Sequence, residues 1–484
     1  MRTVLVYHNP SREILLAPPV GLAYVASAAA DAGHPVRFLD LSRRRQPEAV
    51  LARALREDRP GLVAFSVRNL DNAVHQRLES HLRAHDPLIE LARRAGARVV
   101  VGGPAVSLLG ERSLDVLAAD FAVLGEGEEA FPALLAALDE GRDPRQIPGV
   151  AARDDTGRPT AAPPRRLARF GASGLERWID WPAYGRRGFT WPIQSKRGCA
   201  LGCTYCSYPS LEGRLPRLRP AAEVVDEIEH VARVARPRTF ELVDSTFNVP
   251  VEPALALCRE IRRRGLRVTL TAMGVNPIGA TEELFAEMES AGFNSCMITP
   301  ESASEQMLEG YHKGFGRDAV ERTAERIRRS RLACAWFFLL GGPGETEATV
   351  AESLDFIESR LDWPRCLTII FTGVRIHPGT ALARSEEAAG RLSPDEDLSR
   401  PVFYLSPEVR ESWMLERINR LIARRPNVVH AGEGSPSTWR RLFERSLHTC
   451  GVPPPYWRFV PRYLAWPPIR ALRERHPFVG EVGP

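Results

Sequence analysis

Three cysteines with a distinctive spacing lie in the middle of the chain. They occur in the stretch Lys196-Arg197-Gly198-Cys199-Ala200-Leu201-Gly202-Cys203-Thr204-Tyr205-Cys206, a C-x3-C-x2-C pattern. Three thiols can hold three irons of a cubane iron–sulfur cluster, which needs four ligands, so one iron stays open to another ligand. The spacing therefore predicts a reactive [4Fe-4S] cluster on Cys199, Cys203 and Cys206, which would be both metal ligands and catalytic centre.

Two other interpretations of these thiols remain open. A structural zinc site needs four ligands, commonly in paired C-x2-C knuckles, and no second pair or nearby His pair completes one here. Thiols also pack inside proteins as small apolar residues. The latter role is expected for Cys258, Cys296, Cys334 and Cys366, which lie in apolar stretches.

The composition is that of a large enzyme. At 484 residues, 44% of them hydrophobic, the chain can bury more than one core and is expected to form two or three domains. No apolar run reaches the roughly 18 to 20 residues of a membrane span, so no integral membrane segment is predicted. The net charge of +5, from 65 basic and 60 acidic residues, indicates no nucleic-acid partner.

Cysteine and lysine usage adds two further expectations. None of the eight cysteines lies in the first 198 residues, which fits the reducing cytoplasm better than a disulfide framework. Lysine occurs only at Lys196 and Lys313, whereas every other basic residue is Arg. A compact ammonium is therefore expected to be needed at these two positions, with chance as the competing explanation.

The elements expected to position these residues form two α/β units. In residues 1–145, apolar runs alternate with helical patterns, which predicts a doubly wound, Rossmann-like parallel sheet with its ligand across the carboxyl ends of the strands. No G-x-G-x-x-G follows the first strand, which argues against a dinucleotide. The expected strands are 3–7, 36–39, 62–66, 99–101 and 121–124, and the expected helices are 21–32, 47–56, 74–95, 107–118 and 128–138.

Residues 191–385 contain a second alternating series, which predicts a partial (β/α)6 barrel with functional residues at the strand ends. Residues 146–190 form a linker, with a hairpin turn at Asp154-Asp155-Thr156-Gly157, and residues 386–484 form a small, mostly helical region on the substrate side. The expected barrel strands are 192–195, 239–243, 267–272, 295–299, 335–340 and 367–371, and the C-terminal helices lie near 407–423 and 437–448.

The cysteine motif, with Tyr205 before its last thiol, resembles that of the radical S-adenosylmethionine (radical SAM) enzymes. In that family the open iron binds S-adenosyl-L-methionine, and one electron cleaves the cofactor to a 5′-deoxyadenosyl radical. The resemblance implies an external one-electron donor such as flavodoxin or ferredoxin. It also implies that the protein must hold the substrate beside the radical and exclude solvent.

Four later motifs resemble family elements in the same order. Asp244 begins a D-S-T-F-N run at the end of the second barrel strand, and Glu301 with Ser302 begins E-S-x-S. Lys313 lies in H-K-G, and Gly341-Gly342 open a glycine turn that would let backbone approach adenine. The resemblance implies that these residues bind S-adenosyl-L-methionine or substrate, although a helix cap is an equal alternative for Asp244.

Loops of the first domain resemble those of cobalamin (B12)-binding domains. The resemblance is carried by P-P-x-G-L at 18–22, G-H-x-V-x-x-L-D at 33–40, Gly102-Gly103 and the G-E-G-E that begins at Gly125. The D-x-H-x-x-G motif that supplies a histidine to cobalt is absent, so the lower cobalt face is expected to meet another group. Arg68 and Asn69 are the candidates, and the alternative is a loop in which they hold each other and backbone carbonyls.

Together these resemblances imply a cobalamin-dependent radical SAM methyltransferase that acts on a carbon, or less readily a phosphorus, of a small natural-product-like molecule. Two alternatives remain open: a rearrangement, cyclisation or ring contraction without methyl transfer, and a cobalamin or cluster sensor without turnover. Methylthiolating relatives carry three more cysteines in the first domain and end in a β-barrel, neither of which this sequence shows.

Overall fold

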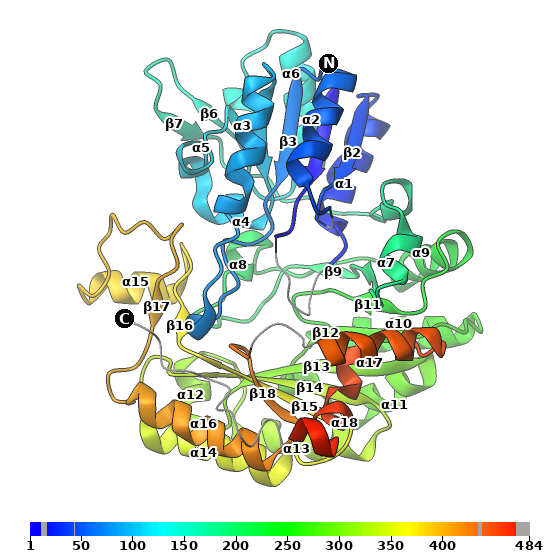
Figure 1. Cartoon of the computed structure of the whole chain (residues 1–484), viewed down its shortest axis with the longest axis vertical. Helices are drawn as coiled ribbons and strands as arrows, with labels where there is room; N and C mark the ends of the chain where they lie inside the picture. The colour runs from blue at the N-terminus through cyan, green and yellow to red at the C-terminus, as the bar shows by residue number, and fades with distance from the viewer. Residues whose placement is uncertain (11–16, 43, 434–437, 471–484) are drawn as a thin grey trace.

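The computed structural model describes residues 1–10, 17–42, 44–433 and 438–470. Figure 1 shows an N-terminal α/β domain above a second, larger α/β domain, with the linker between them. The expected fold class is confirmed: a doubly wound sheet, then a partial barrel of parallel strands, then a mostly helical C-terminal region.

The N-terminal sheet has the order β2-β1-β3-β4-β5-β6-β7, and its first five strands are parallel. Helices α1 and α6 pack on one face and α2 and α3 on the other. The chain order reverses between β1 and β3, which is the point where an open α/β sheet binds its ligand. The elements are β1 (Thr3–Tyr7), α1 (Val20–Asp31), β2 (Val36–Asp40), α2 (Pro47–Asp58), β3 (Leu62–Ser66), α3 (Asp86–Arg94), β4 (Arg98–Gly102), α4 (Pro104–Leu109), α5 (Ser113–Val116), β5 (Phe121–Val123), α6 (Gly127–Asp139), β6 (Val150–Arg153) and β7 (Pro159–Ala161).

The predictions of two helices in this domain were partly wrong. The helix predicted over 74–95 is an extended loop with two short 3-10 turns, and α3 begins only at Asp86. Pro87 favours a helix start at that point, since its fixed φ suits the first turn, while the loop before it reaches the second domain. The helix predicted over 107–118 is interrupted at Gly110, which has a φ of +61°.

The linker begins with the expected hairpin. Its strands β6 and β7 pair antiparallel and extend the N-terminal sheet beyond β5. The chain then runs along the first domain, where the Trp178 indole donates to Ser27 and the Tyr184 hydroxyl donates to Asp40. Two short elements complete the linker, a 3-10 turn at Leu175–Arg177 and α7 (Trp181–Gly185).

The second domain is an open barrel of parallel strands in the order β8-β11-β12-β13-β14-β15-β18. Helices cover its outside, and the buried core lies between them and the sheet. Its elements are β8 (Trp191–Ile193), β9 (Lys196–Arg197), α8 (Tyr208–Leu211), β10 (Arg217–Leu218), α9 (Ala221–Val234), β11 (Phe240–Leu242), α10 (Val251–Arg263), β12 (Leu270–Val275), α11 (Glu282–Ala291), β13 (Phe293–Glu301), α12 (Glu305–Gly310), α13 (Arg317–Arg329), β14 (Ala333–Leu340), α14 (Glu347–Arg360), β15 (Cys366–Thr372) and β16 (Val374–Arg375).

The C-terminal region adds one strand that the sequence did not predict. Strand β18 pairs in parallel with β15 and becomes the seventh strand of the barrel sheet. The first predicted helix corresponds to α16, and the second to α17, apart from residue 437, which lies outside the described residues. The region contains α15 (Ala381–Ala388), β17 (Phe403–Tyr404), α16 (Glu411–Arg424), β18 (Val428–His430), α17 (Thr438–Thr449) and α18 (Val460–Leu464). No helix in the described part of the chain is both long and apolar enough to cross a bilayer.

Candidate active site

The cysteine loop follows β9 at the mouth of the barrel, and backbone hydrogen bonds hold its start. The Gly198 N–H donates to the Glu212 carboxylate (3.0 Å) and the Cys199 N–H to the Gly213 carbonyl (3.0 Å). Gly198 has a φ of +94°, and a Cβ there would lie 2.5 Å from the Leu215 carbonyl oxygen. Only glycine fits this position, so the local sequence fixes the path into the loop.

The thiols of the loop suit iron ligation. Cys199 is buried, Cys203 and Cys206 are half-buried, and none of the three forms a disulfide. Burial raises the pKa of Cys203 and raises that of Cys206 to about 12, so a cationic metal is needed to hold them as thiolates. Within the described residues no three His, Cys, Asp or Glu side chains converge on one metal ion. Cubane ligands need no such convergence, because each thiolate binds a different iron.

Asp244 and Lys196 brace the strand that leads into this loop. The Asp244 carboxylate accepts the backbone N–H groups of Ser195 and Lys196, and it also accepts the Ser195 hydroxyl. The Lys196 ammonium donates to the carbonyls of Phe247 and Val249 and is almost fully buried. Burial raises the pKa of Asp244 to about 6 and lowers that of Lys196 to about 8. In the structure Asp244 caps no helix, because α10 begins after Pro250.

Glu301 and Lys313 meet beside the cysteine loop. Glu301 is the last residue of β13 and adopts a φ of +69°, which is uncommon and strained for a residue other than glycine. Its carboxylate lies 3.6 Å from the Lys313 ammonium, and it accepts no hydrogen bond from the described residues. Lys313 also donates to the Tyr205 hydroxyl of the cysteine motif (3.1 Å) and to the Thr299 carbonyl. Glu301 therefore keeps acceptor capacity for a ligand at the strand ends.

The remaining barrel candidates contact the protein itself. The Ser302 hydroxyl lies 3.0 Å from that of Ser353 on α14 and is fully buried. The N–H groups of Gly341 and Gly342 both donate to Glu345, whose pKa burial raises to about 7. A Cβ on Gly342 would lie 2.0 Å from the Tyr311 hydroxyl oxygen and one on Gly341 2.5 Å from Leu405. Close packing thus accounts for both glycines.

The first domain directs its loops toward the barrel at the switch point between β1 and β3. Arg68 and Asn69 follow β3, where Arg68 is half-buried and Asn69 exposed, and no hydrogen bond joins the two within the described chain. Burial raises the pKa of Tyr208 and Glu241 in the barrel domain, and the Arg68 charge opposes both shifts. Arg68 therefore lies within electrostatic reach of both domains.

The glycines of this domain shape the same edge. Gly103 has a φ of +103°, and a Cβ there would lie 2.7 Å from the Val67 carbonyl oxygen, whereas the neighbouring Gly102 has only ordinary contacts. Gly125, with a φ of +73°, donates its N–H to Ser107 and faces Pro164 of the linker. Any larger residue at position 103 would clash with the Val67 backbone, so close packing after β4 requires glycine there.

The sequence did not predict the ion pairs that join the two domains at the cysteine loop. Arg197 is buried, with its guanidinium 2.6 Å from Glu128 and 3.5 Å from Glu126. It lies over the rings of Tyr24 and Phe170, at 4.7 and 4.3 Å from their centroids. Glu126 and Glu128 are the acidic residues of the G-E-G-E motif, so the motif itself was the available signal. Arg197 stands two residues before Cys199, and the pairing thus ties the first domain to the cluster loop.

A second group of contacts joins the domains on the other side of the barrel. Asp71 and Arg375 form a fully buried ion pair at 2.8 Å. The Thr372 hydroxyl at the end of β15 donates to the Gln76 amide oxygen and lies 3.0 Å from the His430 ring. Asp71 and Gln76 follow β3, whereas Thr372 and His430 are the last residues of β15 and β18. The loop after β3 is therefore held against the carboxyl ends of the barrel strands.

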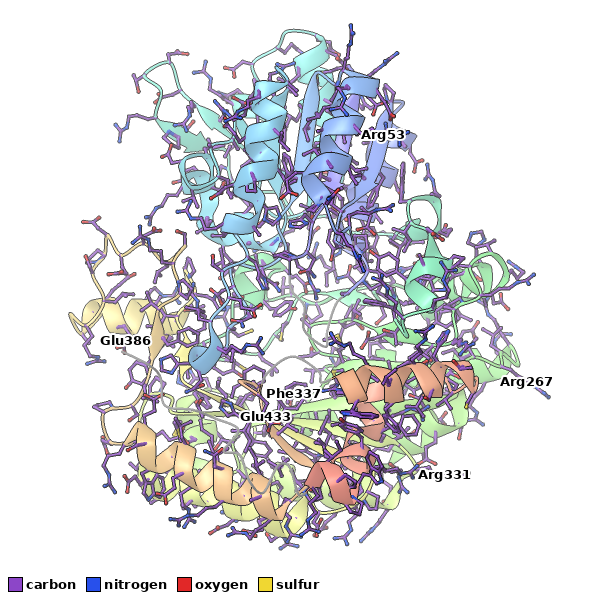
Figure 2. All side chains as sticks on the ribbon, in the orientation of Figure 1. Arg53, Arg267, Arg331, Phe337, Glu386 and Glu433 are labelled. Atoms are coloured by element: carbon purple, nitrogen blue, oxygen red, sulfur yellow. The ribbon has the colours of Figure 1, made fainter. Side chains whose placement is uncertain are left out.

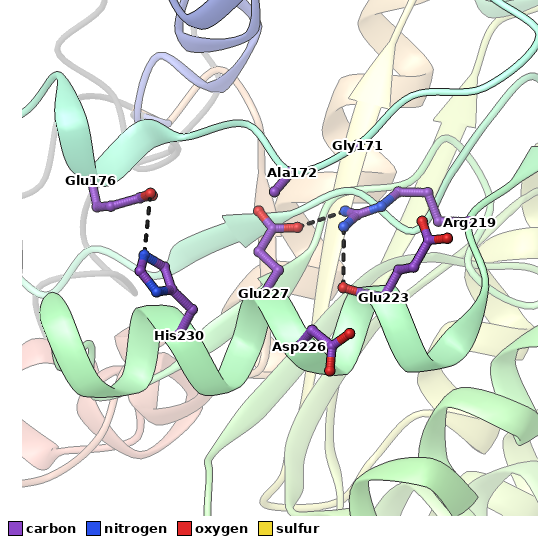
Figure 3. A pocket seen from close by; sticks show the side chains of 8 residues that line it. All are labelled: Gly171, Ala172, Glu176, Arg219, Glu223, Asp226, Glu227 and His230. Atoms are coloured by element: carbon purple, nitrogen blue, oxygen red, sulfur yellow. Dashed lines mark hydrogen bonds and ion pairs between the residues drawn. The ribbon is translucent and has the colours of Figure 1, made fainter.

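A separate cavity of about 310 Å³ lies between the linker and α9 (Figure 3). Its charged side chains are largely paired: Arg219 donates to Glu227 (2.6 Å), and the His230 ring lies 3.5 Å from Glu176. We interpret these paired side chains as contacts that hold the linker against the barrel domain. Figure 2 draws the side chains of the described residues and labels Phe337 of β14 and Glu433 after β18, both of which are half-buried.

Comparisons with known proteins agree with this geometry. Residues 193–357 match the radical SAM superfamily, and residues 15–135 match the B12 binding domain. An uncharacterized methyltransferase of Pyrococcus horikoshii is 24% identical over 75% of this chain and 77% of its own length. Tryptophan 2-C-methyltransferase of Streptomyces laurentii is 25% identical over 78% of this chain and 73% of its own length.

A solved structure has the same fold across almost the whole chain. The radical S-adenosylmethionine methyltransferase TsrM from Kitasatospora setae, with cobalamin and a [4Fe-4S] cluster bound, superposes with a TM-score of 0.81. It is 23% identical, and the match covers 98% of this chain and 99% of that one. The two matched families follow one another in this chain as its two α/β domains do. The chain is therefore a radical SAM enzyme with a B12-binding domain ahead of its radical SAM domain.

Proposed function

We propose that this enzyme transfers a methyl group from S-adenosyl-L-methionine to a carbon atom of a small molecule, using cobalamin and a [4Fe-4S] cluster. The observation that carries the proposal is the joining of the two domains around the cysteine loop, through Arg197 and the buried Asp71–Arg375 pair. This arrangement holds the switch point of the first sheet opposite the barrel mouth. Relatives named as methyltransferases, one of them acting on carbon 2 of tryptophan, support the reaction type.

The residues at the barrel mouth fit the cluster, S-adenosyl-L-methionine and cobalamin. Cys199, Cys203 and Cys206 would hold the cluster, and Glu301 with Lys313 would meet the ammonium and carboxylate of S-adenosyl-L-methionine. Arg68 and Asn69, in the loop after β3, would meet the corrin. Together the bound groups supply an electron, a methyl donor and a methyl carrier.

The protein's own part is to bind, orient and exclude water. The Glu301 carboxylate lies beside the Lys313 ammonium, and Lys313 holds Tyr205 and the end of β13 in fixed relation to the cysteine loop. Arg68 would place a positive charge beside bound cobalamin, between the two domains, and cobalamin would supply the methyl carrier. The interdomain ion pairs hold the loops of the first domain against the barrel mouth, which would limit entry of water when the groups are bound.

The proposal is tested with protein reconstituted anaerobically with iron, sulfide and hydroxocobalamin. Trideuteromethyl S-adenosyl-L-methionine and a small-molecule extract should yield a product that carries the label. The Cys203→Ser variant, assayed in parallel, should yield none. A product that depends on the cysteines but lacks the label would instead establish the rearrangement or cyclisation alternative, and an intact, loaded enzyme without any turnover would establish the sensor.

We further propose that a protein of the flavodoxin or ferredoxin type supplies the electrons, in a reducing cytoplasm. The support is chemical: a cluster on half-buried thiols is damaged by oxidants, and all eight cysteines are free thiols. The small-molecule substrate is proposed on the same basis as the reaction, since tryptophan occupies a TsrM structure.

A further inference from the structure

We propose that an acidic one-electron carrier protein docks on an exposed face beside the cysteine loop, which we call the donor face and define by Arg166, Arg214 and Leu215. The proposal rests on the proposed function, because it assumes that a cluster is bound and must be reduced. It names the place where the electron enters.

The donor face has a short connection to the cluster ligands. The Gly213 carbonyl accepts the Cys199 N–H at 3.0 Å, so one hydrogen bond links the segment bearing Arg214 and Leu215 to a ligand residue. The Leu215 carbonyl lies against Gly198, closer than any side chain at that position would permit. Electron transfer weakens steeply with distance, and covalent and hydrogen-bonded paths favour it over gaps. An electron arriving at Leu215 would therefore have a direct route to Cys199.

The face also has the shape of a docking site. Leu215 is 82% exposed, which is exceptional for a large apolar side chain in this protein. The Arg166 guanidinium lies against Gly213, two residues before Leu215, and donates to the Ser210 carbonyl. Arg214 is exposed and has its guanidinium near Gly202, inside the cysteine motif. An apolar centre with a charged rim is the usual anatomy of a protein interface.

The charge of the face identifies the partner. Neither Arg166 nor Arg214 forms an ion pair with any described residue, and Arg165 beside them is likewise exposed and unpaired in the described chain. The nearest acidic residue along this segment, Glu212, points inward and accepts the Gly198 N–H. An uncompensated basic rim attracts an acidic protein and accelerates its encounter. Small, transient interfaces of this kind are typical of electron-transfer partners.

The test measures cluster reduction in the holoenzyme by stopped-flow absorbance. The donors are a reduced flavodoxin, a reduced ferredoxin and reduced methyl viologen, a small cation that needs no docking face. The variants are Arg214→Glu and Leu215→Ser, and the control is Arg267→Glu, an exposed arginine at the far edge of the barrel domain (Figure 2). Iron content is measured for each protein first.

At low ionic strength, Arg214→Glu should slow reduction by the protein donor about tenfold, and added salt should narrow the difference from wild type. Leu215→Ser should slow it at all salt concentrations. Reduction by methyl viologen should not slow in either variant, and Arg267→Glu should behave as wild type with every donor.

Wild-type rates from the protein donor in both variants would overturn the proposal, as would an equal loss in the Arg267→Glu control. Wild-type enzyme that is reduced by methyl viologen but by neither protein would also overturn it. Failure of the wild type to bind iron is a different result, because it removes the proposed function itself.

Discussion

The buried ion pair between Arg197 and Glu128 predicts that removing the Arg197 charge alone lowers the stability of the enzyme more than removing both charges. In Arg197→Met, Glu128 loses its 2.6 Å partner while its side chain stays only 15% exposed. Glu126 is less affected because Arg217 still donates to it at 2.8 Å. Breaking a buried ion pair from one side costs about 3 to 5 kcal/mol, whereas replacing both charges by neutral groups of similar size costs much less.

The expected result for Arg197→Met is a melting temperature lower by about 10 °C, since each 1 kcal/mol shifts a domain of this size by about 2 to 4 °C. The double variant Arg197→Met/Glu128→Gln should recover more than half of that loss. Anaerobic circular dichroism of the reconstituted proteins measures both, with iron content recorded because Arg197 lies two residues before Cys199. The control Arg94→Met breaks an exposed pair with Glu90 and should leave the melting temperature nearly unchanged.

Two outcomes would refute this reasoning. If Arg197→Met melts with the wild type, the guanidinium contributes nothing that water or neighbouring groups cannot replace. If the double variant is less stable than the single one, the Glu128 carboxylate is not left unpaired by loss of Arg197, and the pair is not the contact that ties the first domain to the cysteine loop.

Three further predictions concern the site. Glu301→Gln should weaken binding of S-adenosyl-L-methionine to the cluster-loaded enzyme about tenfold in calorimetry, because the carboxylate charge is lost. Ser302→Ala should not weaken binding, since that hydroxyl contacts Ser353. Equal effects of the two substitutions would contradict the assignment of Glu301 to the ligand. Arg68→Ala should alter the visible spectrum of bound cobalamin and slow turnover, and an unchanged spectrum with unchanged turnover would dismiss Arg68 as the lower-face group. Burial lowers the pKa of His430 from 6.5 to about 4. The unfolded chain therefore takes up a proton before the folded one, and the free energy of unfolding should fall by about 3 kcal/mol as the pH falls from 6.5 to 4, with no loss above pH 6.5. The His430→Gln variant should lose less stability over that range in urea unfolding, and a wild-type pH dependence in the variant would count against this origin.

Much of the fold followed from local pattern. The apolar strands 3–7 and 62–66 and the barrel strands appeared where alternation with helical periods placed them, because strands buried on both faces read as continuous apolar runs. The failures lie where tertiary contacts override local preference. The helical pattern over 74–95 gave way to an extended loop whose Asp71 and Gln76 bond to the barrel domain. Strand β18 was missed because three residues carry too weak a periodic signal.

The sequence by itself determined three things: the spacing of the cysteines, the glycines at positions whose backbone angles other residues rarely adopt, and the order of the motifs along the two domains. These are local properties, since a C-x3-C-x2-C loop or a glycine at positive φ is written in adjacent residues. The tertiary structure alone decided which polar side chains remain available and which are engaged: Glu301 is free to accept from a ligand, while Asp244, Ser302 and Glu345 are held by their own chain. It also brought Glu128 to Arg197 and Asp71 to Arg375, pairs separated by long stretches of sequence. Such contacts depend on how two domains fold against each other, and no local pattern encodes them.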